Sequence, residues 1–358
     1  MKRYLLVIGI LLTAALSCRQ PVTPDRDMLD SVMAIAADTA GVFRQIVDAG
    51  RIGARGNIAI IGEPGDGIQL ARRFQNMDES DNIDGRPERD SLPDFAGEVF
   101  HVLLDEYNAP YSHFLSFEGD TLSRSGLDSL RELAVRNAVY AWQDKAKILI
   151  FTSPLQAEYG LFDVDTLQQL SGGKSLLVSP VKVMLEKAYA EGDRGIVVWT
   201  SAKTRDSGTW QAVFSQMGWK DATLSVISPD PALDIRTEFR SLLRQFRAEG
   251  GKMDVLLLDT YWANPASLSS EVDIIRQGGT EEDAFFDRML TRNFHFMEPK
   301  SALLSATYDL LRGGSLFAHR ISRPLIRYYE TEESAQGVPV LVEADASYVE
   351  SAYVQDFR

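Results

Sequence analysis

Short, continuous apolar runs alternate along the chain with longer stretches in which apolar residues recur every three or four positions. Such runs are typical of strands buried on both faces of a parallel sheet, and they span residues 57–62, 147–151, 175–178, 195–199, 222–227 and 253–258. The helical spacing predicts helices over 27–49, 123–143, 181–191, 207–218, 233–248, 265–276 and 281–311, the last with a break near Pro299. This alternation predicts βαβ units, and therefore parallel sheets covered by helices on both faces.

A few segments depart from this alternation. Residues 78–94 are polar, acidic and contain prolines, which indicates an excursion over the surface. Residues 113–117 favour a short strand, and the pattern of residues 95–104 is ambiguous. Apolar and polar residues alternate over 338–342, and no helical pattern follows.

Several of the predicted strands end in polar or aromatic residues. In open α/β sheets, ligands bind outside the carboxyl ends of the strands. The sequence therefore predicts a ligand site formed by Gly62, Glu63, Thr152, Ser153, Thr200, Ser201, Asp259, Tyr261 and Trp262. Two structural alternatives stay open. The hydroxyl pairs can cap the turns or helices that follow them, and the two aromatic side chains can pack on a neighbouring helix.

The glycine-containing loop at 62–67 follows a buried strand and leads into a predicted helix. Its spacing is that of a loop that could bind phosphate at a helix N-terminus. However, Glu63 and Asp66 would repel an anion there, so a simple strand-to-helix turn is the competing interpretation. In a cleft, the same carboxylates would suit a cationic or hydroxyl-rich ligand.

Composition and charge narrow the possible partners. With 358 residues, 45% of them hydrophobic and 25% charged, the chain has the composition of a globular protein and the length of two compact units. The formal net charge of -14 would repel a phosphate backbone, so we expect no nucleic-acid partner.

The N-terminus predicts export. Lys2 and Arg3 precede an apolar run at 5–16, which is typical of a secretory signal. Cys18, the only cysteine in the chain, follows Ser17, and this stretch resembles the lipobox of bacterial lipoproteins, except that Ala15 stands where leucine is usual. We therefore expect a lipoprotein signal peptide at 1–17, a lipid anchor on Cys18 and a tether at 18–26. The alternative is an ordinary signal peptide that happens to contain a cysteine.

The order of elements from about residue 175 to 260 resembles part of a type I periplasmic-binding-protein fold, in which two α/β lobes enclose a ligand. The resemblance implies two Rossmann-like lobes with parallel sheets, at 27–190 and 191–358, with allowance for a strand exchanged from the C-terminus. It also implies a lipid-anchored protein, on the periplasmic face or cell surface of a bacterial membrane, that captures a small polar solute. The solute would be delivered to a membrane transporter or only sensed, and the membrane would be contacted through the lipid alone.

Catalytic patterns are weak in this sequence. It has no G-x-S-x-G motif, and none of His101, His113, His295 and His319 has another histidine within four residues. His113, with acidic neighbours, is the best acid/base candidate, whereas His295 between two phenylalanines favours a packing role. The sequence therefore predicts no enzyme, no metal site and no cofactor. The alternatives are a lipoprotein hydrolase with an unrecognised acid/base site, and a surface interaction protein that binds no ligand.

Overall fold

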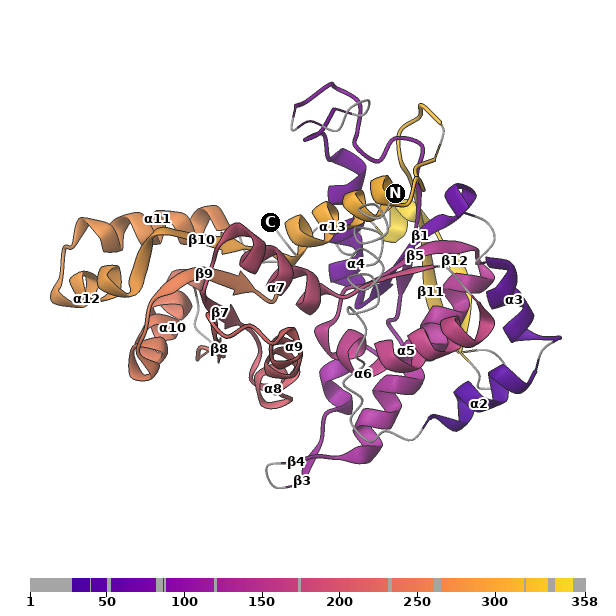
Figure 1. The fold of residues 1–358 in the computed structure, drawn as a ribbon, viewed down its shortest axis with the longest axis horizontal. Helices are drawn as coiled ribbons and strands as arrows, with labels where there is room; N and C mark the ends of the chain where they lie inside the picture. Colours follow the sequence, from indigo (N-terminus) through magenta and orange to yellow (C-terminus); the bar gives the residue numbers. More distant parts are fainter. Residues whose placement is uncertain are drawn as a thin grey trace, which may run out of the picture.

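Two α/β lobes lie side by side in the computed structural model of this protein (Figure 1). The structure describes residues 28–38, 40–49, 53–81, 86, 88–118, 121–172, 175–230, 234–260, 265–318, 320–333 and 339–349. The predicted signal peptide, Cys18 and the tether lie outside these residues, so the anchor stays a prediction. None of the helices in these residues combines the length and the hydropathy that a membrane span requires.

The first lobe is built on a six-stranded sheet with the order β12-β11-β2-β1-β5-β6, in which only β12 is antiparallel to its neighbour. Its strands are β1 (Asn57–Gly62), β2 (Val99–Leu104), β5 (Ala146–Phe151), β6 (Leu176–Val178), β11 (Leu325–Glu333) and β12 (Pro339–Ala344). Its helices are α2 (Asp30–Ala37), α3 (Val42–Ala49), α4 (Pro64–Asn76), α5 (Arg124–Gln143) and α6 (Pro154–Ser171). Short elements complete this lobe: η1 (Gly53–Arg55), η2 (Tyr111–Phe114), and the paired strands β3 (Phe117–Glu118) and β4 (Thr121–Leu122).

The second lobe has a four-stranded parallel sheet with the order β10-β9-β7-β8. Its strands are β7 (Gly195–Trp199), β8 (Thr223–Ile227), β9 (Met253–Leu258) and β10 (Leu290–Met297). Its helices are α8 (Ala202–Asp206), α9 (Thr209–Met217), α10 (Ile235–Glu249), α11 (Pro265–Gln277) and α12 (Glu281–Met289). Two helices, α7 (Pro180–Glu191) and α13 (Pro299–Gly313), carry the chain between the lobes.

Continuous apolar strands are buried on both faces, as the sequence predicts for a parallel sheet. In β1, Ile58 and Ile60 pack with α4 and α13, whereas Ala59 and Ile61 face the opposite core with α2, α3, α5 and α6. The second sheet is covered in the same way, by α10, α11 and α12 on one face and by α7 and α9 on the other. The central strands of both sheets are therefore buried, whereas the edge strands β8, β10 and β12 are partly exposed.

Three predicted elements differ from the structure. The helix expected over 281–311 contains strand β10, whose buried residues at 290, 294 and 297 have a helix-like spacing, and its pairing with β9 shifts register between Leu290 and His295. In place of the strand expected at 113–117, residues 113–114 end helix η2, residues 115–116 are irregular, and only Phe117 begins a short strand. The helix expected over 27–49 is interrupted where the Asp38 side chain accepts a hydrogen bond from the Gly41 N–H.

The lobe boundary also needs correction. After α13 the chain returns to the first sheet, where β11 pairs with β2 and β12 covers its edge (Figure 1). The predicted second lobe at 191–358 therefore ends earlier, and residues 325–344 join the first lobe, as the allowance for a strand exchanged from the C-terminus anticipated.

A buried ion pair joins α5 to α6 beneath the first sheet. Arg131 donates to both carboxylate oxygens of Asp163, at 2.7 and 2.8 Å, and Asp163 is fully buried. We expect Asp163→Ala to lower the free energy of unfolding by about 3–5 kcal/mol, because it leaves the Arg131 charge buried without its main partner. Urea denaturation should show this loss. The matched control is Asp128→Ala, which removes a half-exposed partner of the same arginine and should cost less than about 1 kcal/mol. If the two variants lose the same free energy of unfolding, the buried pair with Asp163 does not contribute more to stability than the half-exposed contact with Asp128.

Candidate active site

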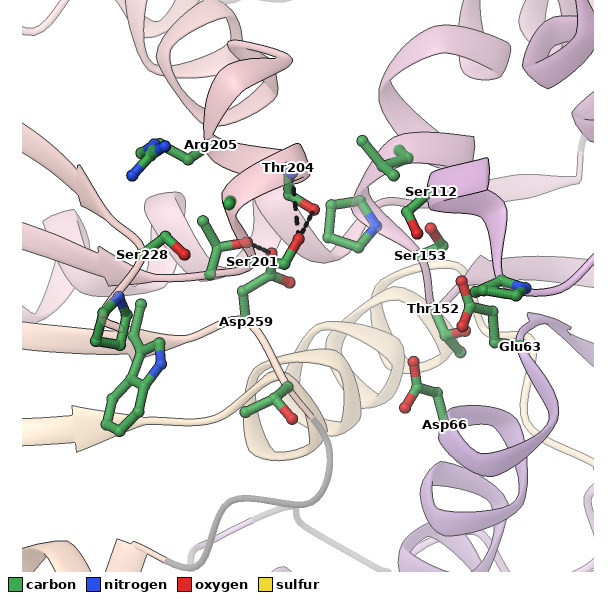
Figure 2. Close-up of a pocket in the computed structure, with 18 of the residues that line it drawn as sticks. Glu63, Asp66, Ser112, Thr152, Ser153, Ser201, Thr204, Arg205, Ser228 and Asp259 are labelled. Carbon is green, nitrogen blue, oxygen red and sulfur yellow. Dashed lines mark hydrogen bonds between the residues drawn. The ribbon is translucent and has the colours of Figure 1, made fainter. Parts of the chain in front are cut away.

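A cleft of about 700 Å³ lies between the lobes at the carboxyl ends of their parallel strands (Figure 2). The first lobe contributes the segments after β1, β2 and β5, and the second contributes those after β7, β8 and β9. In α/β proteins this edge of the sheet is where ligands bind. The cleft is thus the candidate functional site of the molecule.

The cleft brings together six of the nine residues that the sequence analysis selected as ligand-binding. They are Glu63, Thr152, Ser153, Thr200, Ser201 and Asp259. Gly62 is buried at the end of β1, where an added Cβ would lie 1.9 Å from Thr152 Oγ1, so its role is to allow close packing. Tyr261 and Trp262 lie outside the described residues.

Backbone hydrogen bonds hold the strand ends in place. The Thr152 N–H donates to the Ile61 carbonyl at 2.9 Å, and the Asp259 N–H donates to the Trp199 carbonyl at 2.9 Å. Thr152 and Asp259 therefore each follow the last buried residue of a strand, and the hydrogen bonds of the sheet fix the position of their backbone. Ser201 caps α8 by accepting a hydrogen bond from the Thr204 N–H, as the capping alternative predicted for this hydroxyl.

Asp259 is the main titratable group of the second lobe in the cleft. Thr200 Oγ1 and Trp210 Nε1 both donate to its Oδ2, at 2.5 and 3.2 Å. Neither donor uses Oδ1, and Figure 2 shows the carboxyl group directed into the cleft. Burial raises the pKa of Asp259 to about 6, against the opposing effect of the two donors. At neutral pH this carboxyl is mostly ionised and can accept a proton.

Asp66 faces the same cleft from the first lobe (Figure 2). It lies in the first turn of α4, where the helix dipole favours a carboxylate by at most about 1 kcal/mol. Burial, followed by repulsion from Glu63 and Asp259, outweighs the dipole and raises the pKa of Asp66 to about 8, while Lys300 opposes the rise. At neutral pH this carboxyl is mostly protonated and can donate.

Glu63 lines the cleft from the first lobe. Its Oε1 accepts a hydrogen bond from the Tyr111 N–H at 3.0 Å, which fixes the side chain beside the N-terminus of α4. Burial raises the pKa of Glu63, and the Tyr111 N–H and the nearby His113 oppose the rise. His113, the acid/base candidate from the sequence, is not among the residues lining the cleft.

The charges in the cleft are strongly unbalanced. Among the described residues that line it, the acidic ones are Glu63, Asp66, Asp230, Glu238 and Asp259. The only basic side chain in the same lining is Arg205, which is on α8. The cleft therefore favours a neutral or cationic group over an additional anion.

The sequence analysis missed several lining residues, and two kinds of signal were available for them. Ser228, Pro229 and Asp230 follow β8 just as Thr200 and Ser201 follow β7, so the rule of polar strand ends applies to them equally. Asp66 lies one helical turn beyond a strand end. It was not among the nine selected residues, although the sequence analysis had considered its carboxylate, with that of Glu63, as part of a cleft.

Comparison with known proteins places the fold. No family model and no curated protein matches the chain. Among solved structures, a glutamate racemase isoform from Bacillus anthracis matches with a TM-score of 0.53 and 14% identity, over 84% of this chain and 93% of that one. Glutamate racemase from Thermus thermophilus, in complex with beta-chloro-D-alanine, matches with a TM-score of 0.51 and 12% identity, over 86% and 94% of the two chains. In fold, the chain is similar to glutamate racemases.

A third solved structure holds an amino acid. Glutamate racemase from Francisella tularensis, in complex with D-glutamate, matches with a TM-score of 0.50 and 13% identity, over 84% of this chain and 94% of that one. The identities of all three structures are too low to carry more than the fold.

The racemase-like fold corrects the interpretation drawn from the sequence. The resemblance to type I periplasmic binding proteins is wrong, because the matched structures are racemases and the two-lobe α/β architecture alone does not distinguish the classes. The expected solute-binding and transport function and the expectation of a non-enzyme are therefore wrong as well, since the matched proteins are enzymes. The matches do not support the hydrolase alternative or the lipoprotein classification either.

Proposed function

We propose that the chain is an amino-acid racemase or epimerase that transfers protons at a carbon atom held between Asp259 and Asp66. The observation that carries the proposal is the pair of carboxyl groups that face one cleft from opposite lobes (Figure 2). Their environments place their pKa values at about 6 and about 8, on either side of neutrality. Two titratable groups separated in this way suit the roles of base and acid.

The proposed step conserves protons. Ionised Asp259 removes the proton from the substrate Cα, and the electron pair of that C–H bond moves into the adjacent carboxylate. Protonated Asp66 then delivers its proton to the opposite face of the same carbon, which inverts the configuration. Asp259 ends protonated and Asp66 ionised, and exchange with water restores the starting state.

The charges of the cleft restrict the substrate. An amino acid with a neutral or basic side chain suits the five acidic lining residues better than glutamate, which has a second carboxylate. The α-carboxylate of such a substrate would bind at the start of α6, an 18-residue helix whose first residues, Pro154 and Leu155, line the cleft. The α-ammonium group would face the carboxylates.

Solvent exchange tests this function directly. We expect the full chain in D2O at pH 7 to replace the Cα proton of at least one amino acid with a neutral or basic side chain, with change of configuration. Loss of the Cα signal in proton NMR and chiral chromatography would measure the two events. Absence of exchange across both enantiomers of all common amino acids would refute the proposal, and exchange with glutamate alone would refute the substrate class.

A further inference from the structure

A second cluster of titratable groups lies at the opposite edge of the second sheet from the cleft. Glu191 ends α7, Asp193 lies in the turn before β7, and His295 lies on the edge strand β10. One ligand atom from each residue lies within 4.8 Å of the other two. Strand β7 runs from this cluster to Trp199 in the cleft, so the two sites are separated by the length of the strand.

The distances within the cluster suit a shared ion better than direct hydrogen bonds. His295 Nε2 lies 3.5 Å from Glu191 Oε2 and 3.6 Å from Asp193 Oδ2. A charge-assisted hydrogen bond would be about 2.7–2.9 Å. Two ligands bound tetrahedrally to Zn²⁺ at about 2.1 Å would be about 3.4 Å apart. The two separations from His295 Nε2 are close to that value.

Buried atoms in the cluster have no partner. Asp193 is only 8% exposed, and its Oδ2, directed at His295, has no hydrogen-bond partner among the described residues. His295 Nε2 is likewise buried and unpartnered in that part of the chain. A buried polar atom without a partner costs about 1–3 kcal/mol, and a bound cation would remove that cost at both atoms.

The surroundings orient the ligands. His295 Nδ1 lies 3.4 Å from the carbonyl of Asn293, a contact in which Nδ1 carries the proton and Nε2 is left as the ligand. The nearby Asp254 is not available, since its Oδ2 accepts hydrogen bonds from the N–H groups of Arg194 and Gly195. The guanidinium of Arg194 is held by Asp221, at 2.8 Å. Glu191 and His295 are partly exposed, so an ion can reach the cluster from solvent.

We propose that Glu191, Asp193 and His295 form a binding site for a divalent transition-metal ion such as Zn²⁺. Imidazole with two carboxylates is a ligand set that suits Zn²⁺, and the two negative charges match its charge. The ion would join the turn between α7 and β7 to the edge strand β10. The sequence alone predicted no metal site, because these three residues come together only in the fold. The proposal does not depend on the function of the cleft.

Calorimetric titration of the metal-free full chain with Zn²⁺ tests the site. The Cys18→Ser chain is used throughout, so that the thiol cannot contribute. We expect one Zn²⁺ per chain and a rise in melting temperature on binding. His295→Gln and Asp193→Asn should each weaken binding by at least about tenfold. Glu186→Gln, on the same helix as Glu191 but outside the cluster, should bind as the parent does.

Three controls keep the result interpretable. Melting of the metal-free variants reports whether they fold, and if Asp193→Asn or His295→Gln does not, the partly exposed Glu191→Gln replaces it with the same expected loss. Co²⁺ provides a second readout, because tetrahedral coordination gives intense visible absorption that should disappear in His295→Gln. Failure of the parent to bind Zn²⁺, or unchanged binding in the folded cluster variants, would overturn the proposal and leave an ordinary histidine–carboxylate ion pair.

Discussion

Asp259→Asn should lower kcat/KM for racemisation by about 10²–10⁴-fold, the usual contribution of a general base. The amide has nearly the same shape as the carboxyl, and its oxygen can still accept the hydrogen bonds from Thr200 and Trp210. It cannot accept a proton from carbon. The fold should therefore remain while proton removal is lost, and deuterium exchange at Cα should show the loss.

The two enantiomers should respond differently to this substitution. Exchange should disappear for the enantiomer whose Cα proton faces Asp259. It should persist above pH 8 for the other, because ionised Asp66 can still act there as a base. The matched control is Asp273→Asn, an exposed carboxyl on α11 in the same lobe, which should keep full activity. Undiminished exchange of both enantiomers by Asp259→Asn would exclude Asp259 as the base.

Local patterns were sufficient to predict most of the parallel strands. Runs such as 57–62 and 253–258 have no polar face, and only a strand covered on both sides buries such a run. The polar residues that end these strands also predicted much of the cleft, because parallel strands present their carboxyl ends at one edge. Thr152 and Asp259 were located on this basis alone.

Interactions between distant segments were not accessible from local patterns. The buried residues of β10 have a helix-like spacing, and only its pairing with β9 shows that the segment is a strand with an irregular register. The return of β11 to the first sheet depends on pairing with β2, more than 200 residues earlier in the chain. The resemblance to periplasmic binding proteins had another cause: it rested on residues 175–260, and two α/β lobes are compatible with more than one family.

In both sites, the chemistry depends on residues that are far apart in the sequence and meet only in the fold. The raised pKa of Asp66 depends on burial and on Asp259, which is almost two hundred residues away and in the other lobe. The cluster of Glu191, Asp193 and His295 likewise joins positions about a hundred residues apart. A search for closely spaced histidines therefore missed it.

Asp66→Asn should stabilise the protein at high pH while removing the proposed acid. The pKa of Asp66 rises from its ordinary value of 3.8 to about 8 on folding. This carboxyl therefore imposes no cost below about pH 4, an increasing cost as pH rises towards 8, and its full cost above that. After allowance for solvent in the cleft, we expect a gain of about 2 kcal/mol at pH 9 from the neutral amide. Melting temperature should rise by about 3 °C at pH 9 and by less than about 1 °C at pH 4.5.

The same variant should lose inversion but not all exchange. Asp259 can still remove a proton and return a deuteron to the same face, so one enantiomer should exchange with retained configuration. In the direction where Asp259 is the base, the wild-type kcat/KM should fall near pH 8 because Asp66 ionises. This fall should be absent from the pH profile of exchange by the variant. The exposed Asp309→Asn on α13 should change neither stability nor profile. If the gain in melting temperature over the wild type is no larger at pH 9 than at pH 4.5, and inversion is intact, Asp66 is neither buried as a carboxylic acid nor the proton donor.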